Sequence, residues 1–202
     1  TMQSIHEKIK ETVLKTKRGT LLFPEDFTNF GSSEAVRLAL HRLEKQGIIT
    51  RIAQGIYVRP EISKHIGAVL PSAEEVAIGI AKRDRIKIVP TGVYALNALG
   101  LSTQIPMKLV YLTDGAPRII KIGNRTIKFK KTTPKNLLAK GEISSLALQA
   151  LREIGINQIT IDEEKKIIEL LKKETPNNLE HDIQLAPVWI KKIMQKALKS
   201  SK

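Results

Sequence analysis

The sequence predicts an α+β protein with an N-terminal domain over residues 1–66 and a mixed α/β domain over residues 67–202 that ends in helices. Amphipathic helical stretches alternate with short β-prone segments, and tight turns join two pairs of these segments, at Gln54-Gly55 and Gly123-Asn124. The last third instead repeats apolar residues at helical spacing. With 202 residues, of which 42% are hydrophobic, the chain can bury one core or two modest ones.

The N-terminal domain is expected to begin with an amphipathic helix that ends near Lys17. Its apolar stripe consists of Ile5, Ile9, Val13 and Leu14. After Gly19, residues 20–23 form a short β-prone segment. Residues 24–26 then resemble the first turn of a second helix, because proline and acidic residues are favoured there. The core beneath that turn is expected to hold Phe27 and Phe30.

A longer helix is predicted over residues 33–46. Ser32 or Ser33 can accept hydrogen bonds from its first amides, and Gly47 allows the left-handed backbone that ends a helix. Its inward face repeats at steps of three and four residues and consists of Val36, Ala39, Leu40 and Leu43. A different, solvated face carries Arg37, His41 and Lys45.

Two strand-like segments follow this helix, residues 48–52 and residues 56–58, around the turn Gln54-Gly55. The order helix, short strand, short helix, longer helix, hairpin matches a winged helix-turn-helix, in which the longer helix reads DNA and the hairpin is the wing. The alternative is an ordinary amphipathic helix packed on a two-stranded sheet.

In a winged helix-turn-helix, the first half of the recognition helix lies nearest the bases, and its flanks contact phosphates. We therefore expect base contacts from Ser33, Arg37 and His41. Contacts with the phosphate backbone of DNA are expected from Ser32, Lys45, Arg51 and the wing residues Gln54 and Gly55. Arg37 is the best specificity candidate, because arginine can bind guanine O6 and N7 together. The alternative for His41 is an exposed helix residue without a role in binding. Lys17 and Arg18, at the end of the first helix, either contact a phosphate or are solvated charges.

The second domain is predicted to start after a linker over residues 61–70, in which Gly67 is a flexible point. A capping box of Ser72 and Glu75 begins a helix. The following elements are a strand over residues 86–89, a helix that opens at Pro90-Thr91 and closes at Gly100, a strand over residues 108–113 and a turn at Asp114-Gly115.

Residues 118–131, RIIKIGNRTIKFKK, predict a hairpin with a two-residue turn. Pairing Ile122 with Arg125 gives the two faces of this hairpin different characters. The apolar face carries Ile120, Ile122, Ile127 and Phe129. The cationic face carries Lys121, Lys128 and Lys130. These lysines are candidates for phosphate contact, or they are solvated residues that protect an edge strand from aggregation.

The remainder is predicted to be helical, with a break at Pro176 and a final helix whose apolar band includes Val188 and Trp189. Trp189 is the single tryptophan and is expected to anchor the core. The other face of this helix is rich in lysine and offers a surface for a partner.

The charge favours a polyanionic partner: 34 basic residues against 20 acidic ones give a net charge of +14. Residues 1–60 hold ten basic and six acidic residues, residues 61–135 hold thirteen and five, and residues 136–202 hold eleven and nine. Nucleic-acid contact is therefore expected to involve the middle third as well as the N-terminal domain. A lysine-rich soluble protein without such a partner is the alternative.

Several function classes find no support in the sequence. Cysteine is absent and the four histidines are scattered singly, so we expect neither disulfides nor a metal site. No nucleophile elbow, Walker loop, zinc-protease motif or dinucleotide fingerprint is present, so we expect neither catalysis nor a cofactor. Without a long apolar run or the apolar core of a signal peptide, the protein is expected to be soluble and cytoplasmic.

Four stretches together resemble the antitoxins of the abortive-infection AbiE type, which belong to type IV toxin–antitoxin systems, and a closely similar family of bacterial proteins of unknown function. These stretches are ALHRLEKQGIITRIAQGIYVRP, PSAEEVAIGIA, RIIKIGNRTIKFKK and LAPVWIKKIMQKAL. They span nearly the whole chain, although they are patterns of hydrophobicity and glycine and not catalytic signatures.

The resemblance implies an N-terminal winged helix-turn-helix that binds inverted repeats in its own promoter, and a C-terminal domain that carries antitoxicity. The partner would be a nucleotidyltransferase-like toxin encoded next to it, with which no stable complex is required. The resemblance also implies a basic surface of the second domain in operator binding, for which Lys121, Lys128 and Lys130 are the candidates. A stand-alone regulator whose C-terminal domain binds a ligand or a protein is the alternative, and an RNA-binding role has less support because only eight residues are aromatic.

Overall fold

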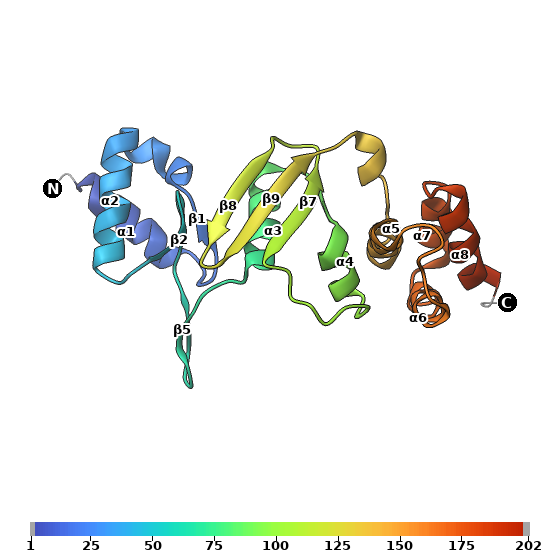
Figure 1. The fold of residues 1–202 in the computed structure, drawn as a ribbon. Coiled ribbons are helices and arrows are strands. Elements are labelled where there is room, and N and C mark those ends of the chain that lie inside the picture. Colours follow the sequence, from blue (N-terminus) through green and yellow to red (C-terminus); the bar gives the residue numbers. More distant parts are fainter. Residues whose placement is uncertain (1–2, 200–202) are drawn as a thin grey trace. The chain divides into compact units, whose positions relative to one another are not determined.

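The computed structural model describes residues 3–199, and it has the α+β composition that the sequence predicts (Figure 1). The chain divides into two compact units. The first contains residues 1–82 and 120–125, and the second contains residues 83–119 and 126–202. The domain boundary between residues 66 and 67 stays a prediction.

The first unit contains most of the elements that the sequence predicts for the N-terminal half. In chain order they are α1 (Ile5–Lys15), β1 (Leu21–Leu22), the 3-10 helix η1 (Pro24–Phe30), α2 (Ser33–Lys45), β2 (Thr50–Ala53), β3 (Ile56–Val58), β4 (Glu61–Ser63), β5 (Gly67–Val69) and α3 (Ala73–Asp84). The last two residues of α3 count with the second unit. Residues 61–70 were expected to be a linker, and they instead contain the two paired strands β4 and β5.

Helix α1 ends at Lys15, earlier than the sequence indicates. Thr16 already has extended backbone, and the Arg59 guanidinium donates hydrogen bonds to the carbonyl oxygens of Leu14 and Thr16, at 2.7 and 3.3 Å. These carbonyls lie at the carboxyl end of the helix, where a cation is favoured. Leu14 was expected in the apolar stripe but is 44% exposed.

The core of the first unit lies between α1, η1, α2 and a three-stranded sheet in the order β1-β3-β2. Its buried residues are Ile9, Val13, Leu22, Phe27, Val36, Ala39, Leu40, Leu43, Ile49 and Tyr57. The inward face predicted for α2 is therefore confirmed, and Phe27 fills the core as expected. Both strand pairs are antiparallel, with Tyr57 of β3 opposite both Leu22 and Arg51.

Helix α3 begins with the predicted capping box. The backbone amide of Ser72 donates to the Glu75 carboxylate at 2.7 Å, and the amide of Glu75 donates to the Ser72 hydroxyl at 3.2 Å. The helix approaches β1 closely, because a Cβ atom at Gly79 would lie 2.5 Å from Cδ1 of Leu21. The capping box orders the start of α3, and the close approach of Gly79 to Leu21 packs the helix on the rest of the first unit.

The second unit adds a sheet and a group of helices. Its elements, with the strand that it shares with the first unit, are β6 (Ile88–Pro90), α4 (Gly92–Ala98), β7 (Lys108–Thr113), β8 (Arg118–Ile122), β9 (Arg125–Lys131), the 3-10 helix η2 (Pro134–Leu137), α5 (Glu142–Ile154), α6 (Ile161–Leu171), α7 (Pro176–Ile183) and α8 (Val188–Lys199). The strand order is β6-β7-β9-β8, so β9 lies between β7 and β8. The β7–β9 pair is parallel, with Lys108 opposite Thr126 and Thr113 opposite Lys131.

Helices α4 to α8 enclose the core of the second unit. Trp189 packs against this core and is half-buried, as expected for an anchor, whereas Val188 is 73% exposed and does not belong to the apolar band. The helical region is interrupted just before Pro176, as the sequence predicts: α6 ends at Leu171, and Pro176 begins α7, where the missing amide hydrogen removes no helical hydrogen bond. In residues 3–199, no helix has the length and apolar character that crossing a bilayer requires.

Candidate nucleic-acid interface

Helix α2 turns a basic face to solvent. Arg37, His41 and Lys45 are exposed on the side opposite Val36, Ala39, Leu40 and Leu43. The structure therefore brings three of the predicted residues together on one helix face. Two further residues of this exposed face were missed by the sequence reasoning, Leu38 and Arg42. Their four-residue spacing, next to the line of Arg37 and His41, is the signal that could have identified them from the sequence.

The cations of this face differ in how far they are engaged. Arg37 and Lys45 form no hydrogen bond or ion pair within residues 3–199, so their charges are available to a ligand. His41 lies 3.6 Å from the carboxylate of Glu44, one turn along the helix. Arginine without a competing acceptor can direct its planar donors to a base edge or a phosphate. Arg37 is therefore the strongest base-reading candidate of the set.

The start of α2 is exposed and carries the two predicted serines. Ser32 is the N-cap, and its hydroxyl accepts a hydrogen bond from the amide of Ala35 at 3.3 Å. Ser33 is the first residue of the helix. The amino end of a helix has a positive partial charge and favours anions. Both serines are thus placed where a phosphate is favoured, although the Ser32 hydroxyl already has a role in the fold.

The β2–β3 turn is tight. Gly55 has φ +70°, a left-handed conformation in which a side chain is strained, and Gln54 before it is exposed. Arg51 is exposed on β2, beside an irregularity in the β2–β3 register, and its Nε donates to the carbonyl of Ala53 at 3.4 Å. The turn and the strand before it therefore present the Gln54 amide and the Arg51 guanidinium to solvent.

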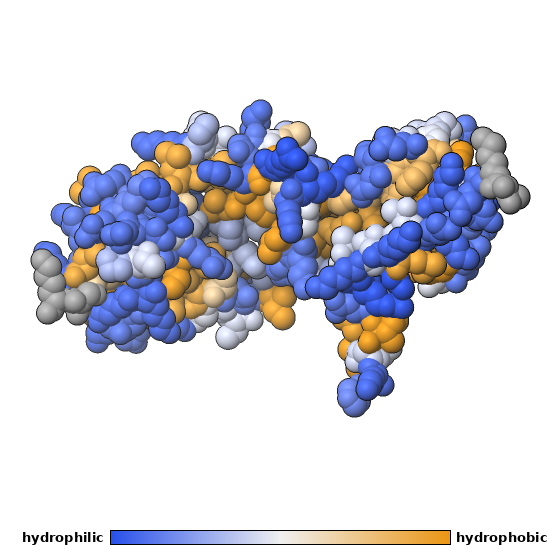
Figure 2. All heavy atoms as spheres, turned by 180° about the vertical axis from the view of Figure 1, so that it is seen from behind, coloured by the Kyte–Doolittle hydropathy of each residue, from blue (hydrophilic) through white to orange (hydrophobic). Residues whose placement is uncertain are grey.

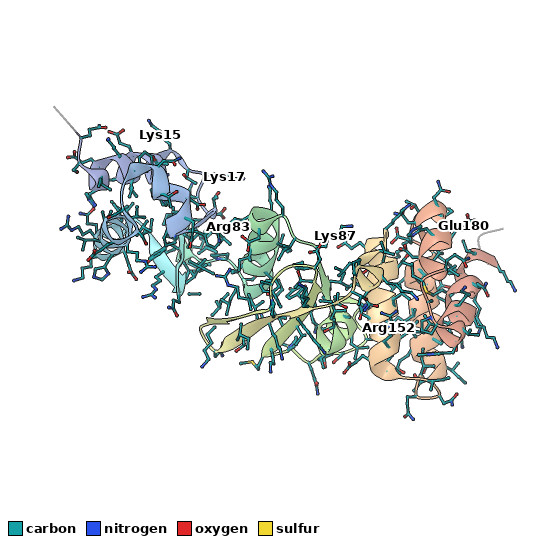
Figure 3. The ribbon with its side chains drawn as sticks, turned by 90° about the horizontal axis from the view of Figure 1, so that it is seen from above. Lys15, Lys17, Arg83, Lys87, Arg152 and Glu180 are labelled. Atoms are coloured by element: carbon teal, nitrogen blue, oxygen red, sulfur yellow. The ribbon has the colours of Figure 1, made fainter. Side chains whose placement is uncertain are left out.

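Lys17 and Arg18 lie beyond the end of α1, and the structure gives them different roles. Lys17 is exposed and, like Lys15, extends outward (Figure 3). Arg18 donates to the carbonyl of Pro60 at 2.9 Å, close to the Arg59 contacts with α1. One guanidinium nitrogen of Arg18 is thus engaged in joining the segment after α1 to the segment after β3.

The three hairpin lysines occupy β8 and β9. Lys121 is exposed on β8, and Lys130 is exposed on β9, where Lys128 is half-buried. Lys128 and Lys130 lie opposite Val110 and Leu112 in the parallel register. Ile127 and Phe129, which alternate with these lysines, are buried. The predicted division of this hairpin into an apolar and a cationic face is therefore confirmed for β9.

Glu74 and Arg125 form the best-defined ion pair of the first unit. Two guanidinium nitrogens of Arg125 donate to the two carboxylate oxygens of Glu74, at 3.0 and 2.7 Å, and both side chains are half-buried. The hydrogen bonds from Arg125 lower the pKa of Glu74 below its ordinary value of 4.5. This pair ties the start of α3 to the start of β9 and was not identified from the sequence.

The second unit contains a cavity of about 540 Å³. Its lining consists of Thr91, Gly92, Val93, Gln104, Ile105, Pro106, Met107, Lys108, Val110 and Glu153. The volume is in the range of small-molecule sites, and the lining combines apolar side chains with one acid and one lysine. Within residues 3–199, no group of three or more side chains is arranged to hold a metal ion.

No curated protein matches the chain. The resemblance to AbiE-type antitoxins is thus not supported by a comparison and stays a prediction. Residues 8–179, well over half of the chain, match a family of unknown function, DUF6088. The protein therefore belongs to the DUF6088 family.

Proposed function

We propose that the protein binds duplex DNA through an N-terminal winged helix-turn-helix and represses its own operon as the antitoxin of a type IV toxin–antitoxin system. The observation that carries the DNA-binding part is the solvent-facing basic side of α2, followed at once by a tight β2–β3 turn. The net charge of +14 supports a polyanionic partner.

In this proposal, the first half of α2 lies in the major groove. Arg37 binds the O6 and N7 atoms of a guanine, and Ser33 and His41 contact neighbouring base edges. The phosphates on either side are bound by the amino end of α2 with Ser32, and by Lys45, Arg51 and the wing residues Gln54 and Gly55. Lys17, Arg18 and the hairpin lysines supply further phosphate contacts.

A mobility shift with the DNA upstream of the protein's own gene tests this interface. Arg37→Ala is expected to weaken binding by about 1–3 kcal/mol, roughly five- to 150-fold, because a bidentate base contact is lost. Arg152→Ala removes the same charge from the exposed face of α5 (Figure 3) and serves as the control. Equal affinity of the Arg37 and Arg152 variants, or no salt-sensitive binding by the wild type, would refute the proposed DNA reading.

The antitoxin role is supported by the resemblance of four stretches of the chain to AbiE-type antitoxins. It implies a nucleotidyltransferase-like protein encoded beside the gene, without a stable complex between the two. Production of that neighbour alone is expected to arrest growth, and co-production of this chain is expected to restore it. Arrest that persists on co-production would remove the antitoxin role and leave the DNA-binding proposal intact.

A second candidate is a stand-alone regulator whose second unit binds a ligand or protein, and the cavity beside Glu153 favours it. Ile105 is 74% exposed at the cavity and Met107 is 52% exposed, so a ligand there would bury apolar surface. This candidate predicts that a bound small molecule or a partner co-purifies with the protein and changes its affinity for the upstream DNA. The antitoxin proposal requires neither.

A further inference from the structure

Strands β4 and β5 form a separate two-stranded ribbon in the first unit. Ile62 pairs with Ala68 and Ser63 with Gly67, in an antiparallel register. The loop between the strands consists of Lys64, His65 and Ile66, and it closes at Gly67, which has φ +77°. A three-residue loop followed by a left-handed glycine is a common hairpin type. The amide of His65 also donates to the Ser63 hydroxyl at 3.2 Å, so the shape of the tip is set locally.

This ribbon projects from the first unit and exposes aliphatic side chains. It stands away from α1 and α2 in Figure 1, and Figure 2 shows apolar surface along it with hydrophilic surface at its end. Ile62 is 61% exposed and Ile66 is 76% exposed. In residues 3–199, no other large aliphatic side chain is more exposed than Ile66. The most exposed aliphatic group thus lies at the tip of a projecting arm, next to Lys64 and His65.

Such an arm is suited to a binding partner. An isolated two-stranded hairpin is marginally stable in water, and burying an exposed isoleucine side chain is favourable. A second protein is a poor match, because a standard interface covers about 800 Å² per partner, more than a few aliphatic side chains on a narrow ribbon supply. A polyanion is a better match, because the cationic Lys64 lies in the same three-residue tip as Ile66 and the chain carries a net charge of +14.

We propose that the β4–β5 ribbon enters a groove of duplex DNA and inserts the Ile66 side chain between neighbouring base pairs, which bends the duplex. This inference rests on the DNA binding proposed above and adds to it a deformation of the operator. Proteins that bend DNA use aliphatic residues in this way, and the unstacked step kinks by about 20–90°. Lys64 contributes by binding a phosphate beside the insertion point.

Ile66 and Lys64 then have separable effects. Insertion of Ile66 is an apolar contact, so its removal lowers affinity and bending without changing the number of counterions released. Lys64 binds a phosphate, so its removal reduces the slope of log affinity against log salt by about one. If the ribbon only touched the DNA surface, the wild-type protein would not bend the duplex, and removing Ile66 would leave the shape of the DNA unchanged.

The test uses the full-length protein and a duplex of its own upstream DNA with a fluorescence donor and acceptor at the two ends. Energy transfer reports the bend, and titration at several salt concentrations gives affinity and slope. Ile66→Ala is compared with wild type, with Lys64→Ala and with Ile161→Ala, whose isoleucine is 74% exposed on α6. We expect Ile66→Ala to lose most of the bend and about tenfold in affinity with an unchanged slope, and Ile161→Ala to match wild type.

Three results would overturn the inference. The first is an Ile66→Ala variant whose energy transfer and affinity equal those of the wild type, while Arg37→Ala still weakens binding. This result would leave the DNA contacts proposed for α2 intact. The second is a change in molar mass of Ile66→Ala in light scattering without DNA, which assigns the ribbon to self-association. The third is no DNA binding by the wild type at any salt concentration, which removes both proposals.

Discussion

Arg125 holds Glu74 in a bidentate, half-buried ion pair, and this geometry makes the first unit sensitive to acid. The hydrogen bonds from Arg125 place the pKa of Glu74 below its ordinary value of 4.5. A carboxyl whose pKa is lowered by folding stabilises the fold above the unfolded-state value. That contribution is lost as the pH falls through the folded-state pKa.

Glu74→Gln is therefore expected to reduce the free energy of unfolding at about pH 7 and to reduce it less at about pH 3, because the contribution of the ionised pair is lost as the pH falls through the lowered pKa of Glu74. Urea unfolding followed by far-ultraviolet circular dichroism at the two pH values measures the difference. Glu180→Gln alters an exposed carboxyl on α7 and is the matched control. The same loss of stability at both pH values would show that the ionised pair is not the origin of the effect.

At the scale of elements, helix α5 begins without a capping side chain of its own. Gly141 is its N-cap and has no side chain that could accept a hydrogen bond. Carboxylates from elsewhere in the chain instead accept hydrogen bonds from the backbone amides at the start of the helix. Asp182 of α7 is completely buried and accepts hydrogen bonds from the amides of Lys140 and Gly141, both at 2.8 Å. Glu174 accepts from Ile143 and Ser144, at 3.0 and 3.3 Å. The start of α5 is thus formed jointly with α7.

Asp182→Asn is expected to destabilise the second unit by about 1–3 kcal/mol, because an amide NH₂ then faces a buried backbone donor. Trp189 packs on the same helical core, so its fluorescence during urea unfolding reports this unit. Glu180→Gln lies on the same helix but is exposed, and it is expected to stay within about 0.5 kcal/mol of wild type. Equal midpoints for the two variants would contradict the assigned role of Asp182.

The elements that the sequence predicts well are those with local signals. The cap at Ser32, the capping box of Ser72 and Glu75 and the two-residue turn at Gly123-Asn124 each depend on neighbouring residues. Ribbon β4–β5 was missed because three-residue strands show almost no alternation. The carboxylate cap of α5 was also missed, because Asp182 is far from Gly141 in the chain.

The candidate site shows the same limit. Arg37, His41 and Lys45 could be placed on one exposed face, because helical spacing is local. The engagement of Arg18 with Pro60 could not be foreseen, because it joins residues from separate elements. Sequence thus indicates which side chains share a helix face, whereas the structure shows which of them are free.

At the scale of the whole molecule, the basic excess extends well beyond α2, with thirteen basic and five acidic residues in 61–135. Lys128→Gln with Lys130→Gln is expected to weaken binding to the upstream DNA and to reduce the slope of log affinity against log salt by about two. The matched control is Lys173→Gln with Lys192→Gln, two exposed lysines of the helical region. Slopes that are the same in both double variants would assign these lysines of β9 to solubility alone.

The position of β9 between β7 and β8 has a consequence for how the chain folds. The hairpin of β8 and β9 can close within about 1–10 μs, because its turn is local. Parallel pairing of β9 with β7 is slower to form, because it closes a longer loop, which includes β8, than the two-residue turn of the hairpin. Until then β8, which follows β7 directly in the chain, competes for the same edge of β7. If β8 pairs with β7 first, these two strands have to separate again before the native strand order can form. Early closure of the turn at Gly123-Asn124 therefore prevents this misfolded pairing.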